Sequence, residues 1–270
     1  MNTDDFNFIA NLLKNQSGLT LKEDKAYLLE SRLVPVAREN NLSGLDELIS
    51  KLRLGTDKSL VVTVTEAMTT NESFFFRDTK PFDLFKDHVL PDLMEARQSQ
   101  KSFRIWCAAA SSGQEPYSLA ILLQEAKAKL AGWRHEIIGT DISRDILKKA
   151  TDGVYSQFEV QRGLPIQLLL KYFTKEGEQW RANEDIRKMI SYKFFNLLED
   201  PRTLGKFDIV FCRNVLIYFD QETKGQVLER IAGLMPDDGI LFLGGAETVL
   251  GITDKFKPVP GLRGIYALNR

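Results

Sequence analysis

The chain has 270 residues, 43% of them hydrophobic, and a net charge of −1. This length allows one large domain or two around a buried core. No apolar run approaches the ~20 residues that cross a bilayer, and the acidic start Met1–Asp5 resembles neither a secretory signal nor a transit peptide. Lysine and arginine are scattered, without the basic stripe of a nucleic-acid-binding protein. We therefore expect a cytoplasmic protein that neither enters the membrane nor binds nucleic acid.

Cysteine and histidine are scarce. Cys107 and Cys212 lie inside apolar runs, which favours core thiols in a reducing compartment, although their spacing does not exclude a disulfide. His88 and His135 stand far apart and away from any group of cysteine or aspartate residues. Since a zinc site needs such a group, no metal site is expected.

Residues 1–70 have helical periodicity only. Apolar residues repeat at the spacing of one helix face in four segments, 6–13, 28–33, 45–52 and 60–68. Pro35 is expected to kink or end the second helix, because proline lacks an amide donor and clashes with the preceding turn. The prediction is a small helical bundle over 1–70, followed by a linker and a leading helix over 71–100.

The pattern changes after residue 100. Short β-rich runs alternate with helical segments, which predicts an α/β domain over 101–270 with a doubly wound parallel sheet. The runs are 103–107, 136–139, 193–195, 207–212, 240–243 and 264–268, and the helical segments are 114–130, 143–150 and 221–234. Only a loop separates the last two runs, so the last strand is expected to be antiparallel. Residues 156–194 interrupt the alternation and predict an inserted subdomain.

The first run of this sheet leads directly into a loop of small residues, Ala108–Glu115, and the next run ends at Asp141. In a doubly wound sheet, ligands bind beyond the carboxyl ends of the strands, at the first strand-to-helix turn. Small side chains let a ligand pack closely, and an acid in the place of Asp141 can accept hydrogen bonds from ribose hydroxyls. The two features together predict a site for an adenosyl ligand.

Two alternatives stay open at this loop. A nicotinamide-dependent oxidoreductase would bring a pyrophosphate to the helix N-terminus, but the loop lacks Gly-x-Gly-x-x-Gly, so an adenosyl ligand without phosphates is favoured. The second alternative is an ordinary turn beside a solvated aspartate.

Two further segments combine aromatic and polar residues. Thr69–Asp78 contains three consecutive phenylalanines beside Arg77, and these rings cannot all face one way. The alternative for this segment is a hydrophobic hinge with a solvated arginine. Cys212–Asp220 leaves a buried strand with polar groups at its end, where Asn214 could instead cap a turn and Tyr218 could pack with its hydroxyl in solvent.

Four motifs, in order along the chain, resemble the chemotaxis receptor methyltransferases, the CheR-type family. They are Thr-Asn-Glu-Ser-Phe-Phe-Phe-Arg-Asp at 70–78, Ala-Ala-Ser-Ser-Gly-Gln-Glu-Pro-Tyr-Ser at 109–118, Asp-Ile-Ser at 141–143 and Cys-Arg-Asn-Val-Leu-Ile-Tyr-Phe at 212–219. The resemblance covers nearly the whole chain, as far as Tyr266. It implies a small helical N-terminal domain joined to a class I methyltransferase domain with an inserted β-subdomain.

The resemblance also implies an activity. Members of this family transfer a methyl group from S-adenosylmethionine to glutamate side chains in the helical cytoplasmic region of membrane chemoreceptors, which leaves S-adenosylhomocysteine and glutamate methyl esters. The chain is accordingly expected to be a protein-glutamate O-methyltransferase of chemotactic signal transduction. The alternative is a non-catalytic signalling module that binds adenosylmethionine, because binding and catalytic residues overlap.

The family's cofactor contacts can be carried over by position. They fall on Asn71, Ser73, Arg77, Glu115, Asp141, Asn196, Leu197, Arg213 and Asn214. By the resemblance, Asp141 would hold the ribose and Glu115 would lie near the methionine ammonium. Asn196 and Leu197 would border the adenine. For Glu115 the alternative is an acid at a helix start, and for Leu197 it is a core position.

The chemistry of the acceptor limits what the catalytic residues must do. A glutamate carboxylate, with a reference pKa of about 4.3, is ionised at neutral pH and needs no general base. Positioning and the exclusion of water remain as the tasks of the enzyme. The resemblance implies that Arg77 and Tyr218 line the methyl-transfer end as catalytic residues. Arg77 is expected to orient the carboxylate of the acceptor or of the cofactor, and Tyr218 to donate a hydrogen bond nearby.

The chain departs from the family in three places. Ser73 stands where threonine is frequent, which keeps the hydroxyl, and Gly244–Glu247 lacks the histidine of the usual Gly-His-Ser-Glu. The hairpin of the inserted subdomain is short, with only Lys175–Glu178 at its turn. Because members that bind a pentapeptide tether at the receptor C-terminus have a longer, glycine-richer loop, no tether is expected.

Basic residues expected on the second helix could meet an acidic receptor helix. They are Lys22, Lys25, Arg32 and Arg38. Residues 1–70 nevertheless hold 8 Lys and Arg against 10 Asp and Glu, a net charge of −2. A solvated face of mixed charge is therefore an equal alternative.

Overall fold

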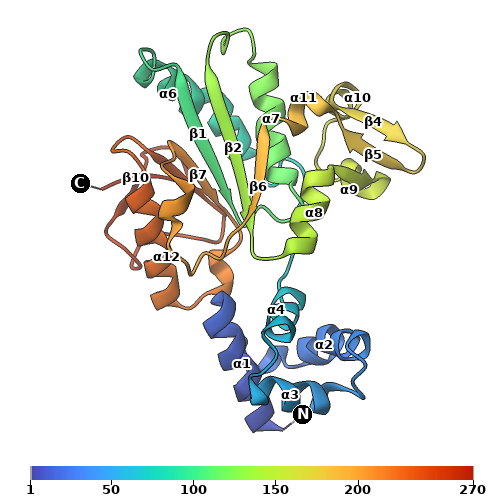
Figure 1. Cartoon of the computed structure of the whole chain (residues 1–270). Coiled ribbons are helices and arrows are strands. Elements are labelled where there is room, and N and C mark those ends of the chain that lie inside the picture. The colour runs from blue at the N-terminus through green and yellow to red at the C-terminus, as the bar shows by residue number, and fades with distance from the viewer. Residues whose placement is uncertain (1, 270) are drawn as a thin grey trace. The chain divides into compact units, whose positions relative to one another are not determined.

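The computed structural model describes residues 2–269 (Figure 1). Its internal contacts divide the chain into two compact units. One comprises residues 2–70 together with 218–223, and the other comprises residues 71–217 and 224–269. Each unit has a hydrophobic core of its own. Within the described residues, no helix has the length and apolar character needed to cross a membrane.

The first unit is helical, as the periodicity predicts. Its elements are α1 (Thr3–Ser17), the short 3-10 helix η1 (Glu23–Lys25), α2 (Tyr27–Glu39), α3 (Leu45–Leu54) and α4 (Lys58–Ala67). The apolar faces of the α-helices share one core, in which Ile9, Leu33 and Leu48 are fully buried. Helices of this length are marginal alone in water, so the shared core is what stabilises them.

Pro35 was expected to kink or end the second helix. It does not end the helix, since α2 continues through Pro35 to Glu39. Pro35 lies on the exposed face, whereas Leu33 and Ala37 on the opposite face are fully buried. An interior proline costs about 3 kcal/mol, and burial of the apolar face offsets that cost.

The second unit contains a seven-stranded sheet with the strand order β6-β2-β1-β7-β8-β10-β9. The strands are β1 (Ser102–Ala108), β2 (Arg134–Asp141), β6 (Ile190–Phe194), β7 (Ile209–Cys212), β8 (Ile240–Leu243), β9 (Phe256–Pro258) and β10 (Ile265–Leu268). Pairing is parallel from β6 to β8, and β10 is antiparallel to both neighbours. The expected α/β class and the antiparallel last strand are confirmed.

Helices connect these strands and precede them. A leading helical segment comes first, with α5 (Lys80–Leu84), a π-helical turn η2 (Phe85–Val89) and α6 (Leu90–Ala96). The crossover helices are α7 (Gln114–Glu125), α8 (Arg144–Asp152) and α12 (Gln221–Leu234), and two 3-10 helices, η3 (Pro201–Leu204) and η4 (Leu216–Tyr218), flank β7. The chain winds outward in both directions from β1 and β7. Open α/β sheets bind ligands at such a reversal of strand order, beyond the carboxyl ends of the strands.

A three-stranded antiparallel sheet of order β3-β5-β4 interrupts this winding. It consists of β3 (Val154–Ser156), β4 (Phe173–Glu176) and β5 (Gln179–Ala182), with the short helices α9 (Gln157–Gln161), α10 (Ile166–Tyr172) and α11 (Glu184–Arg187). The insertion therefore starts slightly before the expected residue 156, and the large sheet resumes at Ile190. Its hairpin turns on Gly177 and Glu178 alone, because Glu176 pairs with Gln179.

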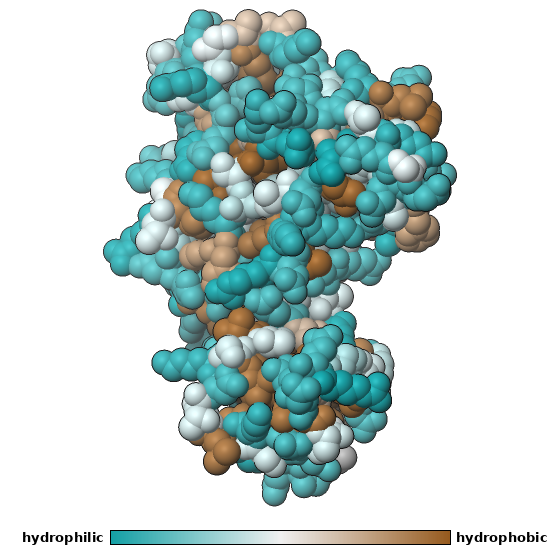
Figure 2. All heavy atoms as spheres, turned by 45° about the vertical axis from the view of Figure 1, so that its right-hand side comes forward, coloured by the Kyte–Doolittle hydropathy of each residue, from teal (hydrophilic) through white to brown (hydrophobic). Residues whose placement is uncertain are grey.

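The core of the second unit is rich in aromatic residues. Phe211 and Phe242 stack on neighbouring strands with ring centroids 4.2 Å apart. The cysteines Cys107 and Cys212 are free and buried, and burial raises the pKa of both thiols. The face drawn in Figure 2 is mainly hydrophilic, with hydrophobic residues in small separate patches.

Candidate functional site

The loop between β1 and α7 has an unusual backbone. Ala109 and Ser111 adopt positive φ angles of 60° and 51°, and Gly113 has φ 91°. A Cβ at Gly113 would lie 2.6 Å from Tyr192 Oη, so this position requires glycine for space as well as for conformation. The Ala110 amide donates to the Thr140 carbonyl at 2.8 Å, which fastens the loop to the end of β2. The result is a tight loop that presents backbone and small side chains at the carboxyl edge of the sheet.

Asp141 ends β2 and is only 6% exposed. Its carboxylate accepts hydrogen bonds from the Ser111 amide at 2.9 Å and from the Ser143 amide at 3.0 Å. The side chain is thus held between the first loop and the start of α8. This geometry excludes the alternative of a solvated aspartate. A buried carboxylate fixed by backbone donors suits the recognition of ribose hydroxyls.

The segment 71–79, here called the arm, is fixed to the α/β unit at several points. Phe75 is fully buried, and the Phe76 amide donates to Ser118 Oγ at 2.9 Å. Ser111 Oγ donates to the Asn71 carbonyl at 3.0 Å, which connects the arm to the β1–α7 loop. A Cβ at Gly163 would lie 2.0 Å from the Phe75 carbonyl oxygen. The hinge alternative therefore does not describe this segment, because its backbone is tightly packed on both sides.

Arg213, which directly follows β7, connects the end of β7 with the arm and with the start of α7 at the carboxyl edge of the sheet. Its side chain is 1% exposed and donates to Glu115 Oε2 and Asp78 Oδ2, both at 2.7 Å, and to the Arg77 carbonyl at 2.9 Å. Burial raises the pKa of Glu115, and the Arg213 charge opposes that shift. Glu115 therefore binds an arginine rather than capping its helix, whose N-cap is Gly113. Arg213 Nε has no hydrogen-bond partner among the described residues, which leaves a buried donor at the site.

Arg77 and Arg162 lie on the ring of Phe74. Their guanidinium carbons are 5.4 Å and 4.3 Å from its centroid. Arg77 also donates to the Glu72 carbonyl at 2.8 Å, and Arg162 pairs with the Glu72 carboxylate at 2.7 Å. The Arg162 hydrogen bond lowers the pKa of Glu72. The arm thus presents two guanidinium groups over one aromatic ring, and Arg77 remains partly exposed.

The remaining expected contacts lie at neighbouring strand ends. Asn196 and Leu197 follow β6 and are partly buried, and the Phe195 amide donates to the Asp141 carbonyl at 3.0 Å. Asn214 follows β7 with φ 59°, and Ser73 is a partly buried residue of the arm. The nine expected cofactor residues therefore belong to one unit and gather on the arm and at the carboxyl ends of β1, β2, β6 and β7.

Tyr218 is the exception. It belongs with residues 2–70 in the first compact unit, where its carbonyl accepts from the Thr20 amide at 2.8 Å. Its side chain is partly buried. Its role beside Arg77 stays a prediction.

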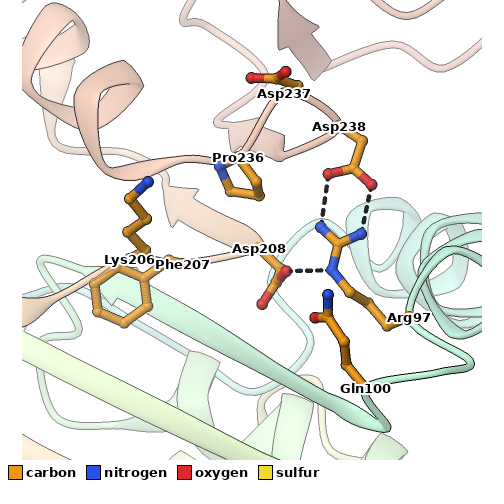
Figure 3. Close-up of a pocket in the computed structure, with 8 residues that line it drawn as sticks. All are labelled: Arg97, Gln100, Lys206, Phe207, Asp208, Pro236, Asp237 and Asp238. Atoms are coloured by element: carbon orange, nitrogen blue, oxygen red, sulfur yellow. Dashed lines mark hydrogen bonds and ion pairs between the residues drawn. The ribbon is translucent and has the colours of Figure 1, made fainter.

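A hollow of about 510 Å³ lies at the opposite edge of the sheet (Figure 3). In it, Arg97 forms a two-pronged ion pair with Asp238, at 2.6 and 2.7 Å, and a third bond to Asp208 at 3.0 Å. The hydrogen bonds from Arg97 hold the pKa of the Asp238 carboxyl below its usual range. Asp208 precedes β7 and Asp238 precedes β8, so the cluster joins strand starts. Since its charges pair with one another, its role is structural.

Sequence reasoning missed several residues of the site. Asp78 and Arg162 bind the side chains just described, and Glu247 accepts backbone hydrogen bonds at the ends of β7 and β8. In the sequence, the one indication that Asp78 and Glu247 belong to the site is their position within or beside segments that were compared with the family. Among the described residues, no group of three or more His, Cys, Asp or Glu side chains could hold a metal ion.

The parallel sheet, the tight loop after β1 and the buried acid at the end of β2 define an α/β domain of the class that binds adenosyl cofactors. The model of the "CheR methyltransferase, SAM binding domain" matches residues 71–265, and that of the "CheR methyltransferase, all-alpha domain" matches residues 4–69. The chain belongs to the CheR methyltransferase family, and its cofactor is S-adenosylmethionine.

Curated relatives agree with this assignment. Chemotaxis protein methyltransferase 1 of Pseudomonas aeruginosa is 39% identical over 97% of this chain and 96% of its own length. Chemotaxis protein methyltransferase 1 of Vibrio cholerae is 38% identical over 95% of this chain and 94% of its own length. Among solved structures, a TehB-like SAM-dependent methyltransferase from Corynebacterium glutamicum is 14% identical and covers 62% of this chain and 78% of its own, with a TM-score of 0.36. The family assignment thus rests on the sequence matches.

Proposed function

We propose that the protein methylates glutamate side chains of chemoreceptors and so forms glutamate methyl esters. The names of the relatives support a chemotaxis methyltransferase. The observation that carries the proposal is the buried Arg213 with Glu115 and Asp78, because it joins the arm, the start of α7 and the end of β7. Fixed charges of this kind suit a reaction of a carboxylate from which water is excluded.

The residues present fit S-adenosylmethionine. The β1–α7 loop has no cradle of glycines for phosphates, whereas Asp141 is a buried acceptor suited to ribose hydroxyls. We assign the ribose to Asp141, the methionine end to Glu115 and Arg213, and the adenine to Asn196 and Leu197. Asn71, Ser73, Arg77 and Asn214 complete the proposed cofactor-binding set. When bound, this cofactor supplies a methyl group on a positively charged sulfur.

The acceptor carboxylate is the nucleophile in this scheme. Held by Asp141, Glu115 and Arg213, the cofactor would supply its methyl group to an oxygen of this carboxylate. An anion and a cation are neutralised together, so a dry site accelerates the step. Arg77 orients the carboxylate, and we retain Tyr218 as a proposed hydrogen-bond donor. No residue needs to remove a proton, because the acceptor is already ionised at neutral pH.

The chemoreceptor region that we propose as partner is the cytoplasmic helical one, and we accordingly place the protein in the cytoplasm. Of the four basic residues considered for this contact, some are less suitable than others in the structure. Arg32 donates to the carbonyls of Met68 and Thr69, at 2.7 and 2.9 Å, so its guanidinium is engaged within its own unit. Lys22 and Lys25 precede α2 instead of lying on it. Arg38 is exposed on α2 and is the better candidate.

We also propose that the protein works without a receptor tether. The two-residue turn at Gly177 and Glu178 supports this, since it leaves no extended loop to close over a peptide. Isothermal titration of the protein with a receptor C-terminal pentapeptide should give no measurable heat. Micromolar binding would contradict the proposal. For function, we divide the chain into a helical N-terminal domain over 1–70, a linker and leading helix over 71–100, and a methyltransferase domain over 101–270 with its insertion at about 156–194.

The test of the function is transfer of a radiolabelled methyl group from S-adenosylmethionine to receptor-containing membranes. The expected product is a labelled receptor that releases volatile methanol in alkali, as methyl esters do and methylated amines do not. Receptor in which the labelled glutamates are replaced by alanine is the control. A protein that binds the cofactor but labels no receptor would instead be the non-catalytic signalling module.

A further inference from the structure

Glu247 lies in the loop after β8 and is 9% exposed. Its carboxylate accepts hydrogen bonds from four backbone amides. Oε2 accepts from Gly244 at 2.7 Å and from Asn214 at 2.8 Å, and Oε1 accepts from Val215 at 2.9 Å and from Ile217 at 3.3 Å. One side chain therefore fastens the chain that leaves β7 to the chain that leaves β8.

The chain after β7 depends on such an acceptor. Asn214 has φ 59°, a conformation that residues other than glycine adopt at a cost. This bend directs the amides of Asn214, Val215 and Ile217 toward one point, a concave arrangement that binds anions. Without an acceptor, these partly buried amides would destabilise the bend. Glu247 supplies a full negative charge at that point.

The neighbouring backbone is shaped to the same carboxylate. A Cβ at Gly244 would lie 2.7 Å from Glu247 Oε2 and 2.8 Å from Asn214 Nδ2. Any side chain at Gly244 would therefore push the carboxylate or the Asn214 amide out of place. The three residues form one close-packed contact between two strand ends.

The segment held by Glu247 begins next to the most buried charge of the site. Arg213 immediately precedes Asn214 and places its guanidinium on Glu115 and Asp78. A shift of the Asn214 bend would move the Arg213 backbone and with it both ion pairs. Glu247 thus acts on the cofactor site through Arg213 and Asn214.

We propose that Glu247 is a positioning residue that sets the affinity of the site for the adenosyl cofactor. The proposal rests on the cofactor residues assigned under the proposed function. Glu247→Gln tests it, because each carboxylate oxygen accepts two amides. Whichever way the new amide turns, its NH₂ group faces two backbone donors.

The measurement is the Kd for S-adenosylhomocysteine by calorimetry, together with the melting temperature. Glu247→Gln should weaken binding by about tenfold while the protein remains folded at the assay temperature. In turnover assays, KM for S-adenosylmethionine should rise by more than kcat falls. Glu247→Asp, which keeps the charge but shortens the reach, should give an intermediate Kd.

Glu229→Gln is the matched control, since it removes the same charge from an exposed position on α12. Its Kd should equal that of the wild type. A merely structural role predicts a lower melting temperature with unchanged Kd in the folded Gln and Asp variants, and that result would overturn the proposal. Binding of the product requires no receptor. The inference can therefore hold even if receptor methylation is not observed, and it can fail while methylation succeeds.

Discussion

Replacing Arg213 by methionine should destabilise the second unit more than the loss of an ordinary ion pair would. The arginine side chain is 1% exposed, and that of its partner Glu115 is 12% exposed. Removing one member of a buried pair leaves an uncompensated charge and costs roughly 3–5 kcal/mol. The second pair, with Asp78, adds little because the Asp78 side chain is 50% exposed. We therefore expect a loss of about 3 kcal/mol at neutral pH.

This loss should depend on pH in a defined direction. Burial raises the pKa of Glu115 above its usual value of 4.5, and Arg213 is the main group that opposes this rise. Without Arg213, the pKa of folded Glu115 should rise further above its unfolded value than it does in the wild type. The folded state then binds more protons than the unfolded state above about pH 4.5, so stability falls as pH rises through that window. The variant should thus lie closer to the wild type near pH 4.5 than at neutral pH.

Urea unfolding of both proteins, followed by tryptophan fluorescence at the two pH values, measures the effect. Arg202→Met is the control, because the Arg202 side chain is 85% exposed in its pair with Asp200. That variant should unfold like the wild type. A loss below about 1 kcal/mol for Arg213→Met, or one equal at both pH values, would refute the reasoning, since exposed pairs behave in that way.

Other changes test further parts of the structure. Arg77→Ala should reduce methyl transfer by about two orders of magnitude through misplacement of the carboxylate, with an unchanged melting temperature, and near-normal transfer would contradict its role. The hydrogen bond from Lys14 lowers the pKa of Asp220 to about 2. Asp220 therefore contributes stability that is present above the unfolded value of 3.8 and is lost as pH falls toward 2. Asp220→Asn should remove this dependence of stability on acid pH, as measured by circular dichroism. Gly163 has φ 87°, and a Cβ added there would lie 2.0 Å from a backbone oxygen. Gly163→Ala should therefore lower the free energy of unfolding by more than 2 kcal/mol, about twice the cost of placing alanine in this backbone conformation alone. For comparison, Gly177→Ala, at φ 60° with open space around it, should show only the conformational cost.

The sheet was predictable because buried parallel strands appear in the sequence as short apolar runs between amphipathic segments. Ile240–Leu243 and Gln221–Leu234 match the structure at both ends. The three-residue strand β3 was not predictable, since Val154–Ser156 is too short to show alternation. Helix α2 continues beyond expectation because the packing of its inner face outweighs the local effect of Pro35.

The candidate site was predictable where one local motif carries the chemistry, as in Ala108–Glu115. Contacts between residues from distant segments of the chain could not be predicted. Arg213 meets Glu115 and Asp78 across more than ninety residues of sequence. Glu247 accepts backbone amides, which any residue provides, so no residue type in the partner segment signals the contact.

The pairing of β1 with β7 has a consequence for how the protein is made. Ile105 pairs with Ile209, and the β1–α7 loop stands beside this junction. Such distant pairing raises the contact order, and the loop-closure entropy must be overcome before the contact forms. A growing chain on the ribosome therefore has the acid of β2 long before it has Arg213 or the segment that holds it. The cofactor edge is completed only after the segment from Arg213 to Glu247 has been synthesised, long after the β1–α7 loop and Asp141.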